Sequence, residues 1–506
     1  MPHVAHDVRR RWPVLPPVGV IPVGVIAVVA LLARLVPVLR GGGLTGVQAY
    51  DDGVYYSASD ALLSGRMPYR DYVLLHPPGI TVILAPFAAL GRLAGDPAGM
   101  AAGRLGFMLV GTACAVLAWA VARRVSPMAG LAAGLLYAVW QPSAYAERTT
   151  LLEPLVNLGL LGALALLPDG ASRRRVALAG VVLGLAVAVK AWAIVPFAVL
   201  VVWLLVRRGW RDSVAFTAAG AGATSVVCLP FLVAAGPELV REVVFDQLGR
   251  PNNGVALVSR LASMESIQLS PGPADGTLAW TSLAVAVVAV GLVAALAWRV
   301  PATRLWAALL AAQSAMLMLS PSYFGHYGSF VAPSLALLAG AGTATLVAWA
   351  LTRSVVLGRL APVAGVVAMV LLSGHVLNHT EGRRVPAAMA DQALAGVDCV
   401  AADSDAALIA ADVLTRDLRH GCPLVVDVTG LTYNQDHGDL GPGPTPTQRR
   451  RDLEWQRQIG HYFDDSGAIV LDQWHSDGLD GQLLAHLERH DLDLGKKSFQ
   501  VLVPAT

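Results

Sequence analysis

The sequence is poor in charged residues and in cysteine. Charged residues make up 14% of the 506 residues and hydrophobic residues 55%, and the mean hydropathy is +0.57. A soluble domain carries roughly 25% charged residues, so this composition excludes a soluble protein and predicts an integral membrane protein. Of the four cysteines, Cys114 and Cys228 lie in apolar segments, where a small buried thiol is expected.

Other features are missing as well. No run of lysine and arginine alternates with aromatic residues, so no nucleic-acid partner is expected. No internal repeat is visible, which disfavours the repeated architecture of many transporters. No His/Cys cluster stands at metal-ligand spacing. The stretch Gly441-Pro442-Gly443-Pro444 is unsuited to be a phosphate loop, because proline lacks the donating N–H.

Long apolar stretches dominate the first three-quarters of the chain. A helix crosses the bilayer core with about 20 apolar residues, and such stretches predict about eleven transmembrane helices. The first is too long for a signal-peptide core, so we expect it to be retained. The predicted spans are 18–39, 98–122, 127–146, 150–168, 176–189, 191–206, 213–235, 278–298, 305–321, 328–351 and 360–378.

Arginine positions indicate the orientation of these helices. Basic residues fall on alternate connections, which the positive-inside rule places in the cytoplasm. We therefore expect a multi-pass protein of the cell membrane with a cytoplasmic N-terminus and an extracytoplasmic C-terminal region. The residues concerned are Arg9 to Arg11, Arg123 and Arg124, Arg173 to Arg175, Arg207, Arg208, Arg211, Arg299, Arg304, Arg353 and Arg359.

The region after about residue 380 differs from the membrane part, residues 1–379. Short apolar runs at 397–402, 423–428, 468–473 and 499–503 read as strands. Helical patterns at 405–418, 448–463 and 479–490 lie between them. This alternation predicts a small extracytoplasmic α/β domain, residues 380–506, with a mainly parallel sheet.

The last two cysteines lie in this predicted domain. Cys399 and Cys422 would stand at the starts of its first two strands. If those strands are neighbours outside the cytoplasm, the two thiols form a reasonable disulfide pair.

A polar loop, residues 40–97, follows the first span and contains Tyr50-Asp51-Asp52-Gly53-Val54-Tyr55-Tyr56. A carboxylate at a water–membrane boundary is suited to act as a general base toward a hydroxyl, and two adjacent carboxylates repel, which raises the pKa of one of them. Asp51 and Asp52 are therefore the candidate catalytic residues. The structural alternative is that one of them caps a helix beginning near Val54.

The same loop contains further polar candidates. Arg66, Arg70 and His76 suit a phosphate, since guanidinium matches phosphate geometry. Their alternative is a local ion-pair network with Asp60 and Asp71, the long side chains reaching toward lipid headgroups. A short helix over 80–90 is expected to lie along the membrane interface.

These motifs resemble the first extracytoplasmic loop of the GT-C polytopic glycosyltransferases. The pattern Asp51-Asp52-Gly53-Val54-Tyr55-Tyr56, then Gly65 to Tyr72, then His76-Pro77-Pro78-Gly79 is most similar to bacterial members of glycosyltransferase family 39, which resemble protein mannosyltransferases and the aminoarabinose transferase. The resemblance implies that Asp51 or Asp52 is the base and that Tyr55, Arg66, Arg70 and His76 bind substrate.

Three further stretches carry the resemblance along residues 40–330. The segment 146–154 supplies Arg148 and Glu153, the segment 184–190 ends in Lys190, and the segment 320–327 contains His326 and Tyr327. The resemblance implies that they face the cavity that holds the carrier phosphate. Each also has a structural alternative: Lys190 reaching toward headgroups, His326 with Tyr327 in an interfacial belt, or Glu153 facing a helix dipole.

The resemblance implies an inverting glycosyltransferase, a hexosyl- or pentosyltransferase such as a mannosyl- or arabinosyltransferase of the cell envelope. Its donor would be a polyprenyl-phosphate-linked sugar and its acceptor a glycan, lipid or protein hydroxyl at the outer membrane face. Some relatives hold a divalent metal cation, so such a cofactor stays possible. A lipid or polysaccharide transporter or flippase is the alternative function, but transporters place ionisable residues near the midplane.

Overall fold

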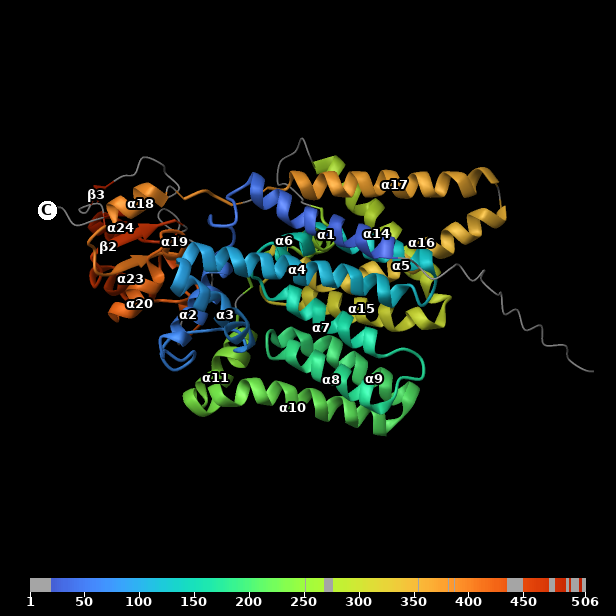
Figure 1. Ribbon diagram of the computed structural model, residues 1–506, viewed down its shortest axis with the longest axis horizontal. Coiled ribbons are helices and arrows are strands. Elements are labelled where there is room, and N and C mark those ends of the chain that lie inside the picture. The colour runs from blue at the N-terminus through green and yellow to red at the C-terminus, as the bar shows by residue number, and fades with distance from the viewer. Residues whose placement is uncertain are drawn as a thin grey trace, which may run out of the picture.

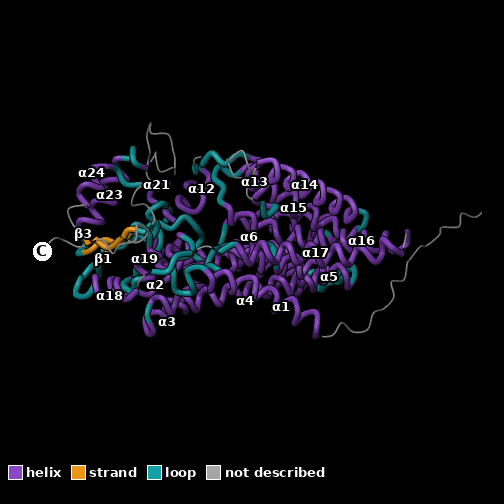
Figure 2. The backbone as a smooth tube through the Cα atoms, turned by 90° about the horizontal axis from the view of Figure 1, so that it is seen from above, coloured by secondary structure: helices purple, strands orange, loops and turns teal. Residues whose placement is uncertain are grey.

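The computed structural model is mostly helical and elongated (Figure 1). It describes residues 20–250, 252–267, 276–353, 355–380, 382–385, 387–434, 449–472, 478–487, 491–492 and 500–502. The helices that the sequence predicts as spans form a bundle, and the C-terminal strands gather beyond one end of it (Figure 2). The predicted anchor Arg9 to Arg11 and the segment 441–444 lie outside the described residues.

Each predicted span corresponds to one helix or to two consecutive helices in the bundle. Within the described ranges, seven helical stretches are long and apolar enough to cross a membrane; the remaining predicted spans are shorter or interrupted. The helices are α1 (Val20–Arg40), α4 (Asp96–Ala122), α5 (Pro127–Ala138) with α6 (Gln141–Glu147), α7 (Glu153–Leu166), α8 (Arg173–Val187), α9 (Ile194–Arg208), α10 (Trp210–Ala235), α14 (Gly276–Trp298), α15 (Arg304–Leu319), α16 (Ala332–Arg353) and α17 (Val355–Asn378).

Short elements connect these helices. The polar loop folds into α2 (Tyr50–Leu63) and α3 (Gly79–Ala94), and α3 covers the segment 80–90 that the sequence predicts to be helical. Helix α2 begins at Tyr50, with Ala49 as its N-cap, so both aspartates lie in its first turn and neither caps it. The other elements are η1 (Ala191–Ala193), α11 (Glu238–Val240), η2 (Arg241–Phe245), α12 (Asp246–Leu248), α13 (Leu257–Met264), η3 (Pro301–Thr303) and η4 (Gly325–Val331).

The C-terminal region contains a small sheet covered by helices. Its strands are β1 (Val400–Ala402), β2 (Ala468–Leu471), β3 (Asp491–Leu492) and β4 (Gln500–Leu502), in the order β1-β2-β4-β3. Among the strands that the structure describes, β1 and β2 pair in parallel and the other two pairs are antiparallel, so the prediction of a mainly parallel sheet is wrong. The helices are α18 (Ala387–Ala393), α19 (Asp405–Ala410), α20 (Leu414–His420), α21 (Leu431–Asn434), α23 (Leu453–Asp464) and α24 (Gly481–Leu487).

The prediction of a strand over 423–428 is also wrong, because tertiary packing draws this segment away from the sheet. Val426 is buried in an apolar cluster with Tyr55 and Leu74 of the polar loop region, instead of joining the sheet. The disulfide between Cys399 and Cys422 is formed, with a Cα–Cα distance of 5.6 Å. Cys399 precedes β1 as predicted, whereas Cys422 follows α20 and begins no strand.

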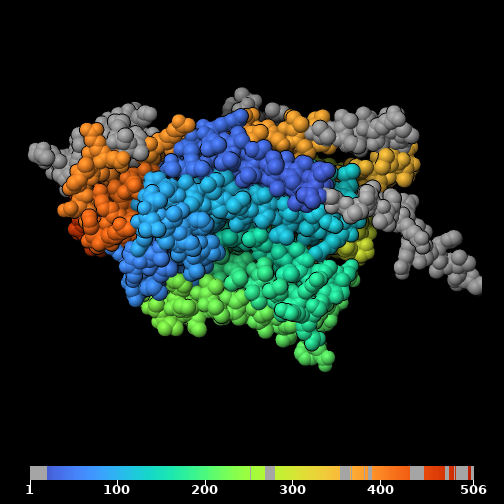
Figure 3. All heavy atoms as spheres, viewed as in Figure 1, coloured from blue at the N-terminus to red at the C-terminus, as the bar shows by residue number. Residues whose placement is uncertain are grey.

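The C-terminal region packs directly on the polar loop (Figure 3). A Cβ added to Gly53 would lie 2.2 Å from the backbone nitrogen of Ala406, so α19 approaches α2 at backbone distance. Thr415 donates a hydrogen bond to Asp60 of α2 at 2.8 Å, and its backbone N–H donates to Asp96 of α4 at 2.9 Å. Gly53, the glycine of the Asp-Asp-Gly motif, therefore allows α19 of the C-terminal region to pack against α2.

Candidate active site

The structure gives the two adjacent aspartates different surroundings. Asp52 is fully buried and accepts hydrogen bonds from Arg104 of α4 at 2.7 and 3.1 Å. Its other oxygen accepts from the backbone N–H of Thr150 at 2.6 Å and from the Thr150 hydroxyl at 3.0 Å. These hydrogen bonds tie α2 to the bundle.

Asp51 lies on the adjoining face of α2 and keeps partial exposure. Burial, followed by the negative charge of Asp427, raises the pKa of Asp51 to about 7. The charges of Lys190, Glu153 and Arg250 also act on it, so residues distant in sequence converge around this carboxyl group. A carboxyl whose pKa is near neutral is suited to take a proton from a hydroxyl.

Lys190 lies at the centre of a cluster of charged and aromatic side chains, and its charge acts on Asp51. Its ammonium group donates to Glu153 Oε1 at 2.5 Å and lies 4.2 Å from the ring centroid of Trp192 and 4.6 Å from that of Tyr327. His326 Nε2 lies 3.9 Å from the same Glu153 oxygen. The predicted residues Glu153, Lys190, His326 and Tyr327 are thus gathered in one place.

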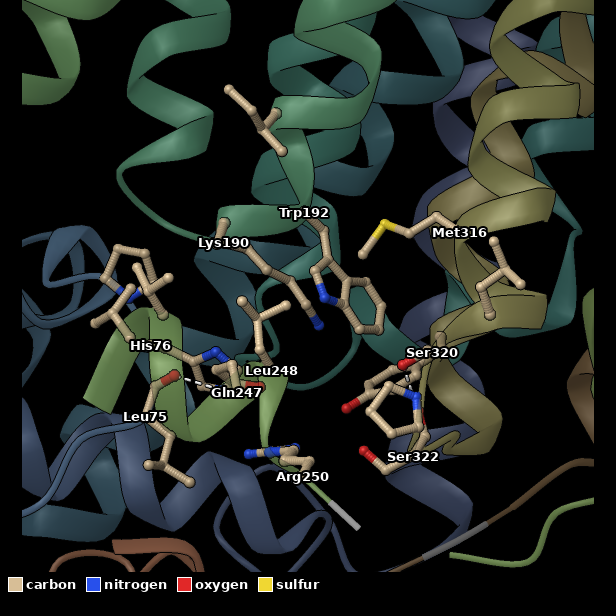
Figure 4. Close-up of a pocket in the computed structure, with 18 residues that line it drawn as sticks. Leu75, His76, Lys190, Trp192, Gln247, Leu248, Arg250, Met316, Ser320 and Ser322 are labelled. Carbon is tan, nitrogen blue, oxygen red and sulfur yellow. Dashed lines mark hydrogen bonds between the residues drawn. The ribbon is translucent and has the colours of Figure 1, made fainter. Parts of the chain in front are cut away.

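An apolar cavity of about 410 Å³ opens beside this cluster. Figure 4 shows Lys190, Trp192, His76 and Arg250 around the same space, with Met316 on another wall. Of the eighteen lining residues, only Lys190 and Arg250 carry a fixed charge. The cavity therefore combines hydrophobic walls with positive charge.

His76 and Tyr55 also belong to this site. Burial, followed by the charge of Lys190, lowers the pKa of His76 well below its ordinary value, so the imidazole is neutral. Tyr55 lies one turn after Asp51 on α2, and its ring is 5.7 Å from that of His76. Burial, followed by the charge of Asp51, raises the pKa of Tyr55, which keeps its hydroxyl protonated.

The remaining predicted residues make contacts elsewhere. Arg66 donates to the carbonyl oxygen of Cys422 at 2.6 Å, and Arg70 forms an exposed ion pair with Asp71 at 2.7 Å. Arg148 is buried and donates to the carbonyl oxygen of His379 at 2.7 Å. None of these three arginines lines the apolar cavity.

Sequence reasoning missed two participants: Arg104, which holds Asp52, and Asp427 of the C-terminal region, which acts on Asp51. Arg250, expected from the sequence to lie in a solvated outer loop, supplies the second cation of the cavity. Arg104 could have been identified from the sequence, because an arginine inside an apolar span is expected to have a specific partner. Asp427 could not, because 376 residues separate it from Asp51 in the sequence (427 − 51).

A buried ion pair inside the bundle was also missed. Arg34 of α1 donates to Glu147 at 2.7 Å, and the Tyr137 hydroxyl donates to the same carboxylate at 2.6 Å. A Cβ on Gly111 would come within 2.2 Å of Glu147 Oε2, so the glycine makes room for the pair. Among the described residues, no group of three or more His, Cys, Asp or Glu side chains is arranged to hold a metal ion.

Comparison with solved structures establishes the fold. ArnT from Cupriavidus metallidurans bound to undecaprenyl phosphate superimposes with a TM-score of 0.62 at 17% identity, covering 96% of this chain and 99% of ArnT. The chain has the GT-C fold. The Archaeoglobus fulgidus oligosaccharyltransferase in complex with zinc and sulfate has a TM-score of 0.56 at 11% identity, covering 93% of this chain and 71% of that one.

Two further comparisons bear on this GT-C protein. The arabinofuranosyltransferase AftD from Mycobacteria has a TM-score of 0.51 at 15% identity, covering 97% of this chain and 40% of AftD. The sequence profile of glycosyltransferase family 87 matches residues 74–321, which include Glu153 and Lys190. No curated protein matches the chain in sequence. This profile match and the fold together support a membrane glycosyltransferase.

Proposed function

We propose that this protein is an inverting glycosyltransferase that moves a sugar from a polyprenyl-phosphate carrier to an acceptor hydroxyl at the outer face of the cell membrane. One observation carries the proposal: Asp51, a carboxyl with a pKa of about 7, lies within electrostatic reach of Lys190 and Arg250, the two cations that line the apolar cavity. A base on one side of the reacting sugar and positive charge on the other are what this transfer requires.

The donor side is built for a charged lipid. The walls of the cavity include Ile194, Val243 and Leu319, which suit an isoprenoid chain, while Lys190 and Arg250 suit the phosphate. Trp192 and Tyr327 pack against the lysine and hold its ammonium group in place. The undecaprenyl phosphate bound to ArnT, a protein of the same fold, supports this choice of carrier.

The transfer step then follows from the charges. Asp51 takes the proton of the acceptor hydroxyl as the hydroxyl oxygen forms a bond to the anomeric carbon of the sugar. The bond between that carbon and the phosphate oxygen breaks, and the polyprenyl phosphate leaves with the electron pair. Lys190 and Arg250 stabilise the negative charge that gathers on the phosphate. With Asp51 acting as base and no covalent bond formed between the sugar and the protein, the displacement is direct and inverts the anomeric configuration.

We place this site outside the cytoplasm. The alternating arginines predict that orientation, and the disulfide between Cys399 and Cys422 supports it, because disulfides persist in oxidising compartments. Cysteine-labelling at position 63, in the exposed last turn of α2, tests the assignment with a membrane-impermeant maleimide on a Cys114→Ser, Cys228→Ser background. Labelling only from the cytoplasmic side contradicts it.

The activity itself is tested with purified protein in nanodiscs. A panel of polyprenyl-phosphate-linked pentoses and hexoses is incubated with mixed acceptors, and the released polyprenyl phosphate is measured by mass spectrometry. We expect release from at least one donor and none with Asp51→Asn. If folded wild-type protein releases carrier from no donor, or if Asp51→Asn releases it as fast as wild type, the proposed reaction is wrong.

A further inference from the structure

A second cavity, lined in part by the C-terminal region, differs from the apolar cavity in the character of its lining. It has a volume of about 470 Å³ and lies between the polar loop at 69–73, the elements α11 and η2, and the C-terminal segment 424–431. Six of its thirteen lining residues are charged, against two of eighteen in the apolar cavity. These six are Arg70, Asp71, Glu238, Arg241, Glu242 and Asp427.

Asp427 connects this polar cavity to the base. It lines the cavity, and its carboxylate accepts a hydrogen bond from the Tyr50 hydroxyl at 3.0 Å. Tyr50 immediately precedes Asp51, and its hydroxyl oxygen in turn accepts from the backbone N–H of Thr429 at 2.9 Å. The backbone N–H of Gly430 donates to Asp427 at 2.7 Å. The C-terminal segment is therefore bonded to the first turn of α2.

We propose that this polar cavity binds the acceptor and that the acceptor is a carbohydrate, a glycan chain whose terminal hydroxyl is presented to Asp51 past Asp427. The inference rests on the proposed function, because it assigns the second substrate of the same reaction. The donor then approaches Asp51 from the apolar cavity and the acceptor from the polar one.

The chemistry of the lining favours a carbohydrate. Carboxylates accept hydrogen bonds from sugar hydroxyls and guanidinium groups donate to them, and the cavity offers both kinds of group. Tyr69 and Tyr72 add aromatic side chains, which combine an apolar body with a polar tip. A volume of about 470 Å³ falls within the range of about 300–1,000 Å³ that encloses a small ligand.

Two of the lining residues are held in specific conformations. Glu242 is buried, and its carboxylate accepts from the backbone N–H of Leu74 at 2.8 Å. Tyr69 has a φ of 67°, in the left-handed region that non-glycine residues rarely adopt, and its hydroxyl donates to the carbonyl oxygen of His76 at 2.7 Å. Strain of this kind clusters where a side chain must be held for function.

A peptide or an apolar acceptor suits the cavity less well. Extended peptides bind by adding a strand to an exposed sheet edge, and the lining residues belong to a loop, to short helical elements and to the irregular segment 424–431 rather than to β1–β4. A lipid acceptor needs a continuous apolar wall; the apolar cavity has such walls, whereas six charged residues interrupt the aliphatic lining of the polar cavity.

The test compares two variants of the cavity lining with one matched control variant outside the cavity. Arg241 pairs with Glu238 and Arg457 pairs with Glu454, both as exposed pairs three residues apart, but only the first pair lines the polar cavity. Arg241→Ala and Glu242→Gln are compared with Arg457→Ala in full-length protein. The acceptors are synthetic oligosaccharides of arabinose, mannose, galactose and glucose, a serine- and threonine-containing peptide and a glycolipid.

We expect transfer to an oligosaccharide, with its KM raised roughly tenfold or more by Arg241→Ala and by Glu242→Gln, because each loses a charged hydrogen-bonding group. The KM for the donor should stay unchanged in both, and Arg457→Ala should match wild type. Transfer to the peptide or glycolipid but to no oligosaccharide overturns the carbohydrate assignment. An oligosaccharide KM that neither variant changes overturns the location.

Direct binding separates this inference from the proposed reaction. Oligosaccharide binding is measured by calorimetry without any donor present. Binding that Arg241→Ala weakens supports the carbohydrate site even if the protein releases carrier from no donor, in which case only the reaction is wrong. Donor consumption by a protein that binds no oligosaccharide and transfers to none overturns the carbohydrate site and leaves the reaction standing.

Discussion

Replacing the two adjacent aspartates by asparagine should produce opposite defects. Asp51→Asn removes the base and leaves the packing of α2 intact, because no ion pair holds that side chain among the described contacts. Loss of a general base typically costs about 10²–10⁴-fold in rate, equivalent to roughly 2.7–5.5 kcal/mol of activation free energy. We expect a loss in that range, with a melting temperature close to that of wild type.

Asp52→Asn should instead destabilise the protein. It removes the buried negative charge opposite Arg104, and breaking such a pair typically costs about 3–5 kcal/mol. The lower end applies here, because Arg104 keeps its hydrogen bonds to the carbonyl oxygens of Leu44 and Gly46 at 2.6 and 2.7 Å. The free energy of unfolding should therefore fall by about 3 kcal/mol.

The assay measures the transfer rate and the thermal unfolding of both variants in the same nanodiscs. Transfer by the folded fraction of Asp52→Asn should stay within roughly tenfold of wild type. The reasoning is refuted if Asp52→Asn is as stable as wild type but inactive while Asp51→Asn stays active, because the roles would then be exchanged.

Three other predictions concern the same site. Since only deprotonated Asp51 acts as base, the transfer rate should rise with pH up to about 7 and then level off in a pH–rate profile. Asp427→Asn removes a negative charge that raises the pKa of Asp51, so it should move this rise to lower pH. Lys190→Gln should weaken binding of undecaprenyl phosphate roughly tenfold or more, whereas Lys190→Arg retains most of it, and equal affinities in a calorimetric titration would count against a phosphate role. Gly53→Ala places a Cβ 2.2 Å from the nitrogen of Ala406 and should loosen the C-terminal region, seen as faster proteolysis in detergent; unchanged proteolysis would show that the contact is dispensable.

Much of the fold was readable from local patterns. All eleven predicted spans correspond to helices, because an apolar stretch beside lipid must satisfy its backbone hydrogen bonds internally and has no alternative but a helix. The disulfide partners were readable too, since Cys399 and Cys422 are the two cysteines outside the apolar segments. The GT-C expectation drawn from the polar loop is confirmed.

Tertiary structure decided what sequence could not. The segment 423–428 has the composition of a strand, yet Val426 packs against the polar loop region, because burial there competes with pairing in the sheet. Asp51 and Asp52 are equivalent in sequence and differ because the helix gives them different neighbours: Asp52 pairs with Arg104, and Asp51 lies under the influence of Asp427, Lys190 and Arg250. The sequence alone determined which carboxylates, cations and aromatic side chains can take part in the site. Long-range contacts determined which of them meet, because the charge and burial around a carboxyl group depend on neighbours that lie hundreds of residues away in the chain.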